Sequence, residues 1–301
     1  MIKNFIRNNY NFIEKYFPFL STIPAAIIIV LVVGFPTIYA LYTGFFEKNL
    51  LTRVFRYIGI NNYIKIVHDP KFWEYLENTT VYTIGSVTIG FLLALILALA
   101  LYNVKRFRVI FLTIILLPWL IPVISAAVMW KWMIHDFYGL INIILLDIGF
   151  ITKPIIMMSS GISAMITLIG VDIWSRTPFA TLILFAGMQR INEDLFDAAR
   201  IDGANSIQIL RQIFLPLIRP EILIVLVVQT MFVFREVGLP YVLTGGGPGS
   251  STETLALYIY RTGNMFLRQG YASALSLVML MLTVCFVFVY IKVILGKEES
   301  I

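Results

Sequence analysis

One apolar run decides the fold class: residues 79–104, with the sequence TTVYTIGSVTIGFLLALILALALYNV. The run contains no Asp, Glu, Lys or Arg, and a helix crosses the ~30 Å hydrocarbon core of a bilayer in about 20 residues. It is therefore long enough and apolar enough to be a membrane-spanning helix. The run lacks the alternation of polar and apolar residues that a membrane β-barrel strand requires, so we predict an all-α integral membrane protein.

The composition of the whole 301-residue chain supports this class. Hydrophobic residues make up 59% and charged residues only 13%, whereas a soluble domain carries about 25% charged residues. The same values exclude intrinsic disorder. The net charge of +6 arises from basic residues in short tracts between apolar runs, which is typical of segments beside anionic lipid headgroups. The single cysteine, Cys285, excludes an intrachain disulfide and a cysteine-based metal cage.

Five further apolar runs predict five more spans, so we expect six transmembrane helices. The first span has no clear small-residue cleavage site and is expected to stay in the mature protein. Pro118 and Pro122 lie in the third span, where they fit a kinked helix buried among its neighbours. The six predicted spans are residues 20–45, 79–104, 109–130, 161–189, 221–243 and 271–295.

The distribution of basic residues predicts the orientation of these spans. Lys and Arg are denser in the segments on the side of the two termini, and residues 105–108, KRFR, are the clearest tract. Positive residues favour the cytoplasmic side, so we expect both termini there in a multi-pass protein of the cell membrane. The long loops then lie outside, where they form a docking surface or merely cap the bundle. The predicted organisation is a cytoplasmic segment 1–19, a six-helix domain 20–295 and a cytoplasmic tail 296–301, with outer loops 46–78, 131–160 and 244–270.

Motifs of catalytic chemistry are absent from the sequence. There is no His-Glu-x-x-His zinc motif, no Gly-x-Ser-x-Gly elbow and no phosphate-binding Gly-x-x-x-x-Gly-Lys-Ser/Thr loop. The glycine run 245–249 has no βαβ context and predicts a turn-rich loop. We therefore expect no enzyme activity and no bound metal, and an ATP-driven step would need another chain to bind ATP.

The sequence of the loop 190–220 predicts two short helices. Asn192 can cap the first helix, whose first turn holds Glu193 and Asp194 at the positive end of the dipole. Gly203 supplies a left-handed stop. By these patterns the loop is either an interfacial amphipathic hairpin or a docking element for a soluble partner. The second helix is expected to start at a cap formed by Asn205 or Ser206, to run to about Phe214, and to be ended by Pro216 and Pro220.

The spacing within this loop resembles the coupling loop of ATP-binding-cassette importer permeases. The matching positions are Asp197-Ala198-Ala199, then Gly203, then Ile213-x-Leu215-Pro216, with Asp in place of the usual Glu at the first position. Other stretches resemble the carbohydrate-uptake subgroup, which includes maltose-permease-like and glycerol-phosphate-permease-like proteins. These are 117–119, LPW, residues 174–179, WSRTPF, and 241–248, YVLTGGGP.

The resemblance implies a transport subunit that forms half of a solute pathway. The implied partners are a second homologous permease, two ATP-binding subunits that hold ATP and Mg, and an extracytoplasmic solute-binding protein; no cofactor is expected in this chain. A stand-alone ion-coupled secondary transporter is the alternative, since charged residues lie within the spans, but it would not need the docking loop. The residues implied to couple to the ATPase are Asp197, Ala198, Ala199, Gly203, Ile213, Leu215 and Pro216.

The resemblance also implies which residues line the solute path. Polar groups would hydrogen-bond to sugar hydroxyls, and Phe179 or Phe232 would stack on a pyranose ring. Asp172 and Arg176 are four residues apart on one helical face and can pair. They either form a structural ion pair or indicate a charged substrate. The sequence does not identify the substrate, which could be a disaccharide, an oligosaccharide or a glycerol phosphate. The implied path residues are Asp172, Ser175, Arg176, Phe179, Gln229, Phe232 and Glu236, with Arg235 as a further charge in the fifth span.

Overall fold

The computed structural model describes residues 17, 19 and 21–295. Most of these residues are helical, in agreement with the predicted class. The chain divides into two compact units: Val67–Arg261 with Val278–Ile301, and Met1–Ile66 with Thr262–Leu277. The predicted cytoplasmic ends, 1–19 and 296–301, lie outside the described residues apart from positions 17 and 19. Their side of the membrane remains a prediction.

The smaller unit contains the first span and a short β-hairpin. Ser21–Thr43 forms one helix that is long and apolar enough to cross a membrane. The antiparallel hairpin that follows was not predicted. The side-chain amide of Asn62 supports it by donating to the carbonyls of Gly44 and Phe46, at 2.8 and 3.0 Å. The elements are η1 (Val30–Gly34), α2 (Phe35–Thr43), β1 (Phe46–Asn49), β2 (Val54–Tyr57), α3 (Asn61–His68) and η3 (Arg261–Met265).

The larger unit is a bundle of long helices. α4 (Pro70–Asn103) and α8 (Gly161–Met188) pack along each other, with α5 (Arg108–Leu120) and α12 (Arg219–Phe234) against them. Ala94, Ala98 and Ala180 are fully buried at this contact, because small side chains let membrane helices approach closely. The remaining elements are α6 (Val123–Met133), α7 (Leu140–Asp147), α13 (Gly238–Leu243), α14 (Leu255–Tyr260) and α15 (Gln269–Leu295), whose first residues belong to the smaller unit.

The third predicted span is broken and is not a single kinked helix. α5 and α6 meet at 92°, with Pro118 inside the last turn of α5 and Pro122 directly before α6. Neither proline can donate a helical hydrogen bond. A residue that precedes proline is also driven out of the helical region, and Ile121 accordingly has φ −81° and ψ 124°. The prediction of one kinked helix was therefore wrong, because the prolines separate two helices that meet at nearly a right angle.

The fifth predicted span is also discontinuous. α12 ends at Phe234, and a helix resumes only at Gly238 as α13, so the prediction of one helix over 221–243 was wrong. The 16 residues of α12 extend for only ~24 Å at 1.5 Å per residue. Within the described part of the chain, four helices are long and apolar enough to cross a membrane, and up to six spans result if each of two bent helix pairs counts as one.

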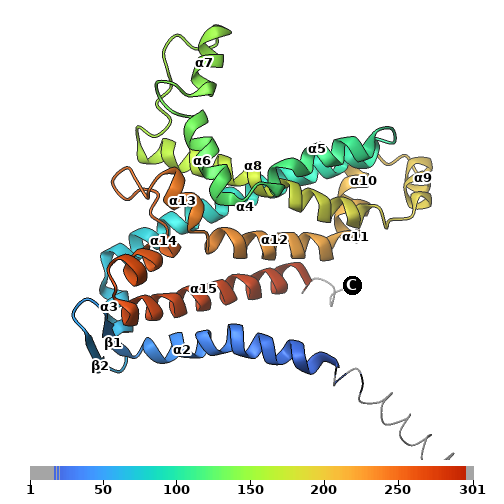
Figure 1. The fold of residues 1–301 in the computed structure, drawn as a ribbon. Coiled ribbons are helices and arrows are strands. Elements are labelled where there is room, and N and C mark those ends of the chain that lie inside the picture. The colour runs from blue at the N-terminus through green and yellow to red at the C-terminus, as the bar shows by residue number, and fades with distance from the viewer. Residues whose placement is uncertain (1–16, 18, 20, 296–301) are drawn as a thin grey trace, which may run out of the picture. The chain divides into compact units, whose positions relative to one another are not determined.

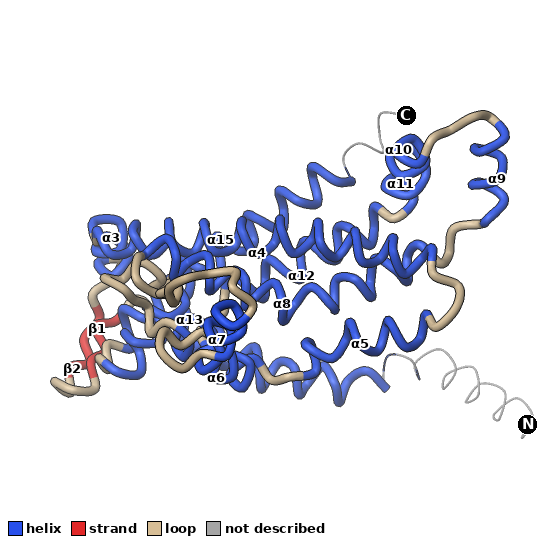
Figure 2. Tube along the Cα trace, turned by 90° about the horizontal axis from the view of Figure 1, so that it is seen from above, coloured by secondary structure: helices blue, strands red, loops and turns tan. Residues whose placement is uncertain are grey.

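The loop 190–220 forms helices, as predicted. The Asn192 side chain accepts a hydrogen bond from the Asp194 N–H, Gly203 has φ +83°, and Asn205 caps the second helix through a reciprocal pair with Gln208. The elements are α9 (Glu193–Ile201), α10 (Ser206–Ile209), η2 (Leu210–Phe214) and α11 (Leu215–Leu217). Figures 1 and 2 show them at one end of the bundle, with α6, α7 and α13 at the other.

The prediction that Pro216 ends the second helix near Phe214 was wrong. Ser206–Leu217 runs as one helix and meets α12 at a bend of 72°. Pro216 cannot donate to the carbonyl four residues earlier. The helix accommodates the missing hydrogen bond through the π-helical turn η2. There the N–H of Leu215 donates to the carbonyl of Leu210, five residues back. Such single π turns are a known way of accommodating a local interruption in a helix.

Candidate functional site

A largely buried cluster of three charges lies between α8 and the break that follows α12. The Arg176 Nε donates to the Asp172 Oδ1 at 2.7 Å, which confirms the predicted pairing, and the Arg176 Nη2 donates to the Glu236 Oε2. We call Asp172, Arg176 and Glu236 the charge triad. Asp172 is 1% exposed. A charge held in a membrane-spanning segment normally faces a partner or a cavity, and this cluster provides both.

Two further elements hold the triad in place. Tyr82 on α4 is fully buried, and its hydroxyl donates to the Asp172 Oδ1 at 2.9 Å. The Glu236 Oε1 accepts from the N–H groups of Gly238 and Leu239 at the start of α13, at 2.8 and 3.2 Å. The break after α12 therefore turns Glu236 back toward α8, and the triad joins α4, α8 and α13.

Replacing Tyr82 with phenylalanine should destabilise the larger unit. The change removes a buried hydrogen bond to a charged group, which is worth about 1.5–3 kcal/mol, and leaves the shape of the ring unchanged. We expect a lower midpoint in thermal unfolding of the detergent-solubilised protein. Tyr75→Phe removes a hydroxyl nearer the start of the same helix and is the matched control. Equal midpoints for the two variants would contradict the role of Tyr82.

A cavity of about 260 Å³ lies beside the triad. Trp119, on the α5 side of the break, stacks on Phe179 with ring centroids 5.3 Å apart and an interplanar angle of 21°. The Arg176 guanidinium lies 5.7 Å from the centroid of the Phe232 ring. The cavity is lined by Ser175, Arg176 and Phe179 from α8, by Gln229 and Phe232 from α12, and by Trp119, Leu120, Ile121, Pro122 and Val123 from the α5–α6 break.

The predicted path residues meet at this cavity. Five of the seven line it. The other two, Asp172 and Glu236, do not line the cavity but form ion pairs with Arg176, which does. Arg235 lies apart from the lining: it is exposed at the end of α12, with its guanidinium 5.4 Å from the centroid of the Phe232 ring. Aromatic faces beside hydroxyl, amide and guanidinium groups can hold a molecule that has both an apolar face and hydroxyls.

One polar atom at the cavity has no partner among the described residues. The Gln229 Oε1 is buried and accepts no hydrogen bond. The nearby Thr177 Oγ1 also lacks a partner among the described residues, and both atoms face Gly90 of α4. Buried polar groups in native proteins almost always find a partner. Because the Gln229 Oε1 is buried against α4, it is not presented to the cavity in this structure.

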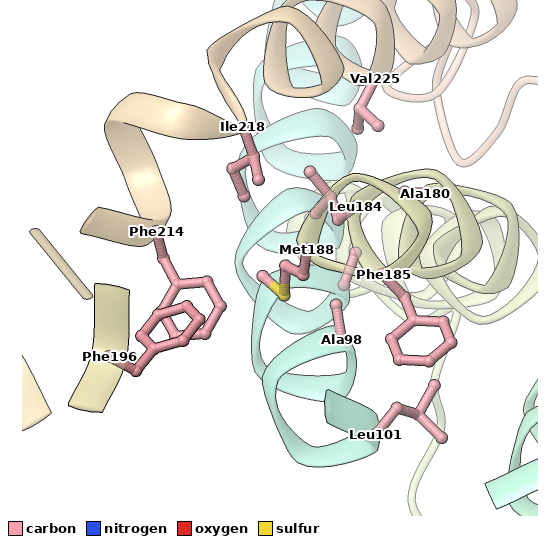
Figure 3. Packing of buried hydrophobic residues seen from close by; sticks show 11 residues of the cluster. Ala98, Leu101, Ala180, Leu184, Phe185, Met188, Phe196, Phe214, Ile218 and Val225 are labelled. Atoms are coloured by element: carbon pink, nitrogen blue, oxygen red, sulfur yellow. The ribbon is translucent and has the colours of Figure 1, made fainter. Parts of the chain in front are cut away.

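The loop with α9–α11 is anchored in the bundle by aromatic residues that the sequence analysis missed. Phe196 and Phe214 are buried, with ring centroids 4.7 Å apart, and point toward each other beside α4 (Figure 3). Tyr102 of α4 packs on both rings at 5.8 and 5.1 Å. The available signal was the presence of one phenylalanine in each of the two predicted short helices.

The opposite face of this loop is exposed. Ile201 is 86% exposed, and Leu195 and Ile207 are also largely exposed. Of the residues implied to couple, Asp197, Ala198 and Gly203 are exposed, and Ala199, Ile213, Leu215 and Pro216 are partly buried. A hollow of about 580 Å³ lies between this loop and the end of α4, with Asp197 among its lining residues.

The two ends of the loop are tied together at its base. Arg190, just after α8, forms an ion pair with Glu221 in the first turn of α12. Glu221 is buried against Gly187 of α8, where a Cβ atom would meet the Glu221 side chain. The loop therefore leaves and rejoins the bundle at one point.

The predicted glycine-rich turn at 244–248 is present and is held by a second ion pair. Arg261 pairs with the buried Glu253, and its Nη2 donates to the Gly245 carbonyl at 2.8 Å. Gly246 has φ +81°, and a Cβ atom there would meet the Glu253 carboxylate. Burial raises the pKa of Glu253 and the adjacent Arg261 acts against that rise.

Replacing Arg261 with glutamine should loosen this turn. The change leaves the Glu253 carboxylate buried without its cation, which we expect to cost about 2 kcal/mol or more. Limited proteolysis should then cut within residues 244–254 several times faster than in the unmodified protein. Arg268→Gln, at an exposed arginine nearby in the sequence, is the control. An unchanged cleavage rate for Arg261→Gln would contradict the pinning role of the ion pair.

The sequence of this chain is similar to those of known membrane transport proteins. Residues 87–298 match the family described as binding-protein-dependent transport system inner membrane component. The chain is 35% identical to the sulfoquinovosyl glycerol transport system permease protein SmoG of Agrobacterium fabrum, over 95% of this chain and 92% of that protein. It is also 35% identical to the trehalose/maltose transport system permease protein MalF of Thermococcus litoralis, over 79% of each.

A solved structure shares the fold. A chain of the bacterial alginate ABC transporter, crystallised in complex with an alginate pentasaccharide-bound periplasmic protein, superposes with a TM-score of 0.78. The match covers 94% of this chain and 96% of that chain, at 22% sequence identity. At this level of identity the likeness concerns the fold.

Proposed function

The chain belongs to the family of binding-protein-dependent transport system inner membrane components, and from this premise we propose that it forms half of the sugar pathway of an ATP-driven importer. As a member of that family it is a multi-pass membrane protein and a transport component, not an enzyme. The family is defined by its dependence on a binding protein, which favours this reading over a stand-alone ion-coupled transporter.

The observation that carries the proposal is the cavity at the α5–α6 break. Residues implied to touch solute come from two helices separated in the sequence, yet Ser175, Arg176, Phe179, Gln229 and Phe232 line one space. The aromatic rings would stack on a pyranose face, and the polar groups would hydrogen-bond to its hydroxyls. Discontinuous helices beside a binding site are a recurrent feature of membrane transporters. The sugar transported by relatives such as MalF is consistent with this chemistry.

The loop 190–220 would supply the coupling to ATP. We propose that its exposed face, with Leu195, Ile201 and Ile207, seats in a cleft of an ATP-binding subunit, and that the aromatic anchor of Phe196 and Phe214 passes its movement to α4. The ATP and Mg would be bound by two such subunits, outside this chain. The proposed coupling residues are Asp197, Ala198, Ala199, Gly203, Ile213, Leu215 and Pro216.

The proposed assembly has two further partners. A second homologous permease would complete the pathway, and an extracytoplasmic binding protein would deliver the sugar. In this arrangement the chain crosses the membrane six times, with the bent pair α5–α6 counted as one span and α12 as the fifth span. Both termini and the loop 190–220 face the cytoplasm, and the Gly-rich turn at 244–248 faces outward.

A cysteine-protection experiment tests the sugar site. Cys285 is the single native cysteine, so Ser175→Cys in a Cys285→Ala background gives one nearly isosteric thiol in the cavity. In the purified importer we expect a small thiol reagent to label this position and millimolar maltose to slow the labelling at least fivefold. Ser159→Cys, at an exposed position outside the cavity, is the control and should label at one rate with or without sugar.

The same experiment can contradict the proposal. If no sugar from a panel of maltose, trehalose, sulfoquinovosyl glycerol and an alginate pentasaccharide slows labelling at position 175, the cavity is not a sugar site. If labelling at position 175 blocks sugar uptake only as much as labelling at position 159, the cavity does not lie on the solute path.

A further inference from the structure

We infer that the cavity takes a neutral sugar and rejects anionic ones, and that Glu236 determines this specificity. The inference rests on the proposed function and names the substrate class of the same site. It follows from the number and placement of the charges at the cavity wall and from the hydrogen bonds already made by Arg176.

The charges at the wall do not favour an anion. Among the described residues that line the cavity, Arg176 is the single charged one, and two carboxylates hold it, Asp172 and Glu236. The formal net charge of the triad is therefore −1. Arg235 is exposed outside the lining, and its guanidinium faces the Phe232 ring, so it does not supply a free cation inside the cavity.

The hydrogen-bonding groups of Arg176 lead to the same conclusion. A free guanidinium binds a carboxylate, sulfonate or phosphate with two parallel N–H donors. Here the Nε and the Nη2 already donate to Asp172 and Glu236, so the edge of the guanidinium that carries the Nε is not free to bind a solute anion with two parallel donors. The guanidinium has five N–H groups, and those that remain can still donate singly to uncharged hydroxyls.

The size of the expected discrimination follows from Coulomb's law. If the triad acted as one net negative charge about 6 Å from a solute anion, at an effective dielectric constant of about 20, the anion would bind roughly a hundredfold more weakly than its neutral counterpart. This is an upper limit, because Arg176 lies nearer to the cavity than the two carboxylates. A neutral sugar avoids this repulsion and can contact the rings of Trp119, Phe179 and Phe232, while Ser175 can hydrogen-bond to one of its hydroxyls.

Glu236→Gln is the informative substitution. The amide oxygen can still accept from the N–H groups that start α13, while the net charge of the triad rises from −1 to 0 and Arg176 loses one of its two counter-ions. We therefore expect the barrier to anionic sugars to fall. Asp172→Asn makes the same change of charge from the other side and keeps an acceptor for Tyr82 and Arg176, so it covers the case in which Glu236→Gln does not fold.

The experiment measures protection of the single thiol at position 175 in the purified importer, without binding protein, which would otherwise select the solute first. Maltose and trehalose are the neutral probes, and sulfoquinovosyl glycerol and an alginate pentasaccharide are the anionic probes. With the triad intact we expect the neutral sugars to protect at concentrations at least tenfold lower. Glu236→Gln or Asp172→Asn should reduce the ratio of the protecting concentrations of anionic and neutral sugars by at least tenfold. Glu77 is an exposed carboxylate on α4, and Glu77→Gln should leave this ratio unchanged.

The outcomes separate this inference from the proposed function. Equal protection by neutral and anionic sugars with the triad intact, or a gap that neither Glu236→Gln nor Asp172→Asn narrows, would overturn the assignment of a neutral substrate while leaving the sugar site in place. Protection by no sugar at all would overturn the proposed function and this inference with it.

Discussion

Replacing Arg176 with alanine should abolish accumulation of the folded protein. The change leaves the Asp172 and Glu236 carboxylates in a buried site without a cation, and the loss of one partner from a buried ion pair costs about 3–5 kcal/mol. Native proteins are stable by only about 5–15 kcal/mol, and the same guanidinium also joins α8 to the break after α12. We therefore expect little monodisperse protein after detergent extraction and no sugar uptake.

The control for this prediction is Arg235→Ala. Arg235 is a neighbour of Glu236 in the sequence but is exposed, and within the described part of the chain its guanidinium lies over the Phe232 ring. Its removal should therefore change the yield by less than twofold. Near-normal yield and uptake for Arg176→Ala would contradict the structural role of the triad.

A charge exchange tests whether the cluster acts as a pair or as a triad. The double change Asp172→Arg with Arg176→Asp would restore an isolated pair, but it places an acidic side chain against Glu236. Because Glu236 contacts Arg176 directly, we expect the double variant to remain unfolded, and addition of Glu236→Arg to recover part of the yield. Full recovery in the double variant would show that Glu236 is dispensable for the cluster.

Replacing Gly203 with valine should uncouple the loop 190–220 from its ATP-binding partner. Gly203 has φ +83°, and no atom lies within 4 Å of the position where a Cβ would stand. The penalty is therefore conformational and not steric, about 1–2 kcal/mol, and it is relieved only if α10 swings relative to α9. That movement would separate the exposed Ile201 and Ile207 side chains. We expect sugar uptake to fall at least tenfold, with less ATPase subunit recovered in co-purification.

Gly203→Asn provides the matched control. Asparagine tolerates the left-handed conformation better than other residues with a side chain, so this variant should keep most of the uptake. If Gly203→Val and Gly203→Asn transport equally well, the shape of the turn has no part in coupling.

The long spans could be predicted because their signal is local. A run of about 20 apolar residues has few alternatives to a membrane helix, and α4, α8 and α15 follow such runs. The broken spans could not be predicted in the same way. Whether Pro118 and Pro122 kink a helix or end it depends on what fills the bend. The segment after α12 places Glu236 against Arg176, sixty residues earlier, and a contact at that separation leaves no local signal in the sequence.

In the candidate site, too, the features that depend on local sequence could be predicted and those that depend on distant partners could not. The pairing of Asp172 with Arg176 follows from their spacing on one helix, and the caps and the glycine turn in the loop 190–220 follow from local backbone chemistry. Tyr82, Trp119, Phe196 and Phe214 were missed because their roles depend on partners that are distant in the sequence. Each is an aromatic residue in a chain with many, so its type alone did not distinguish it.

The most direct test of the account is the energy source of uptake. The complete importer, purified through a tag on this chain and reconstituted in liposomes, should accumulate labelled maltose or trehalose only when ATP is present on the side of the ATPase subunits and the binding protein on the other. Collapse of ion gradients should leave the rate unchanged. Uptake by this chain alone, driven by an ion gradient and independent of ATP, would contradict the account.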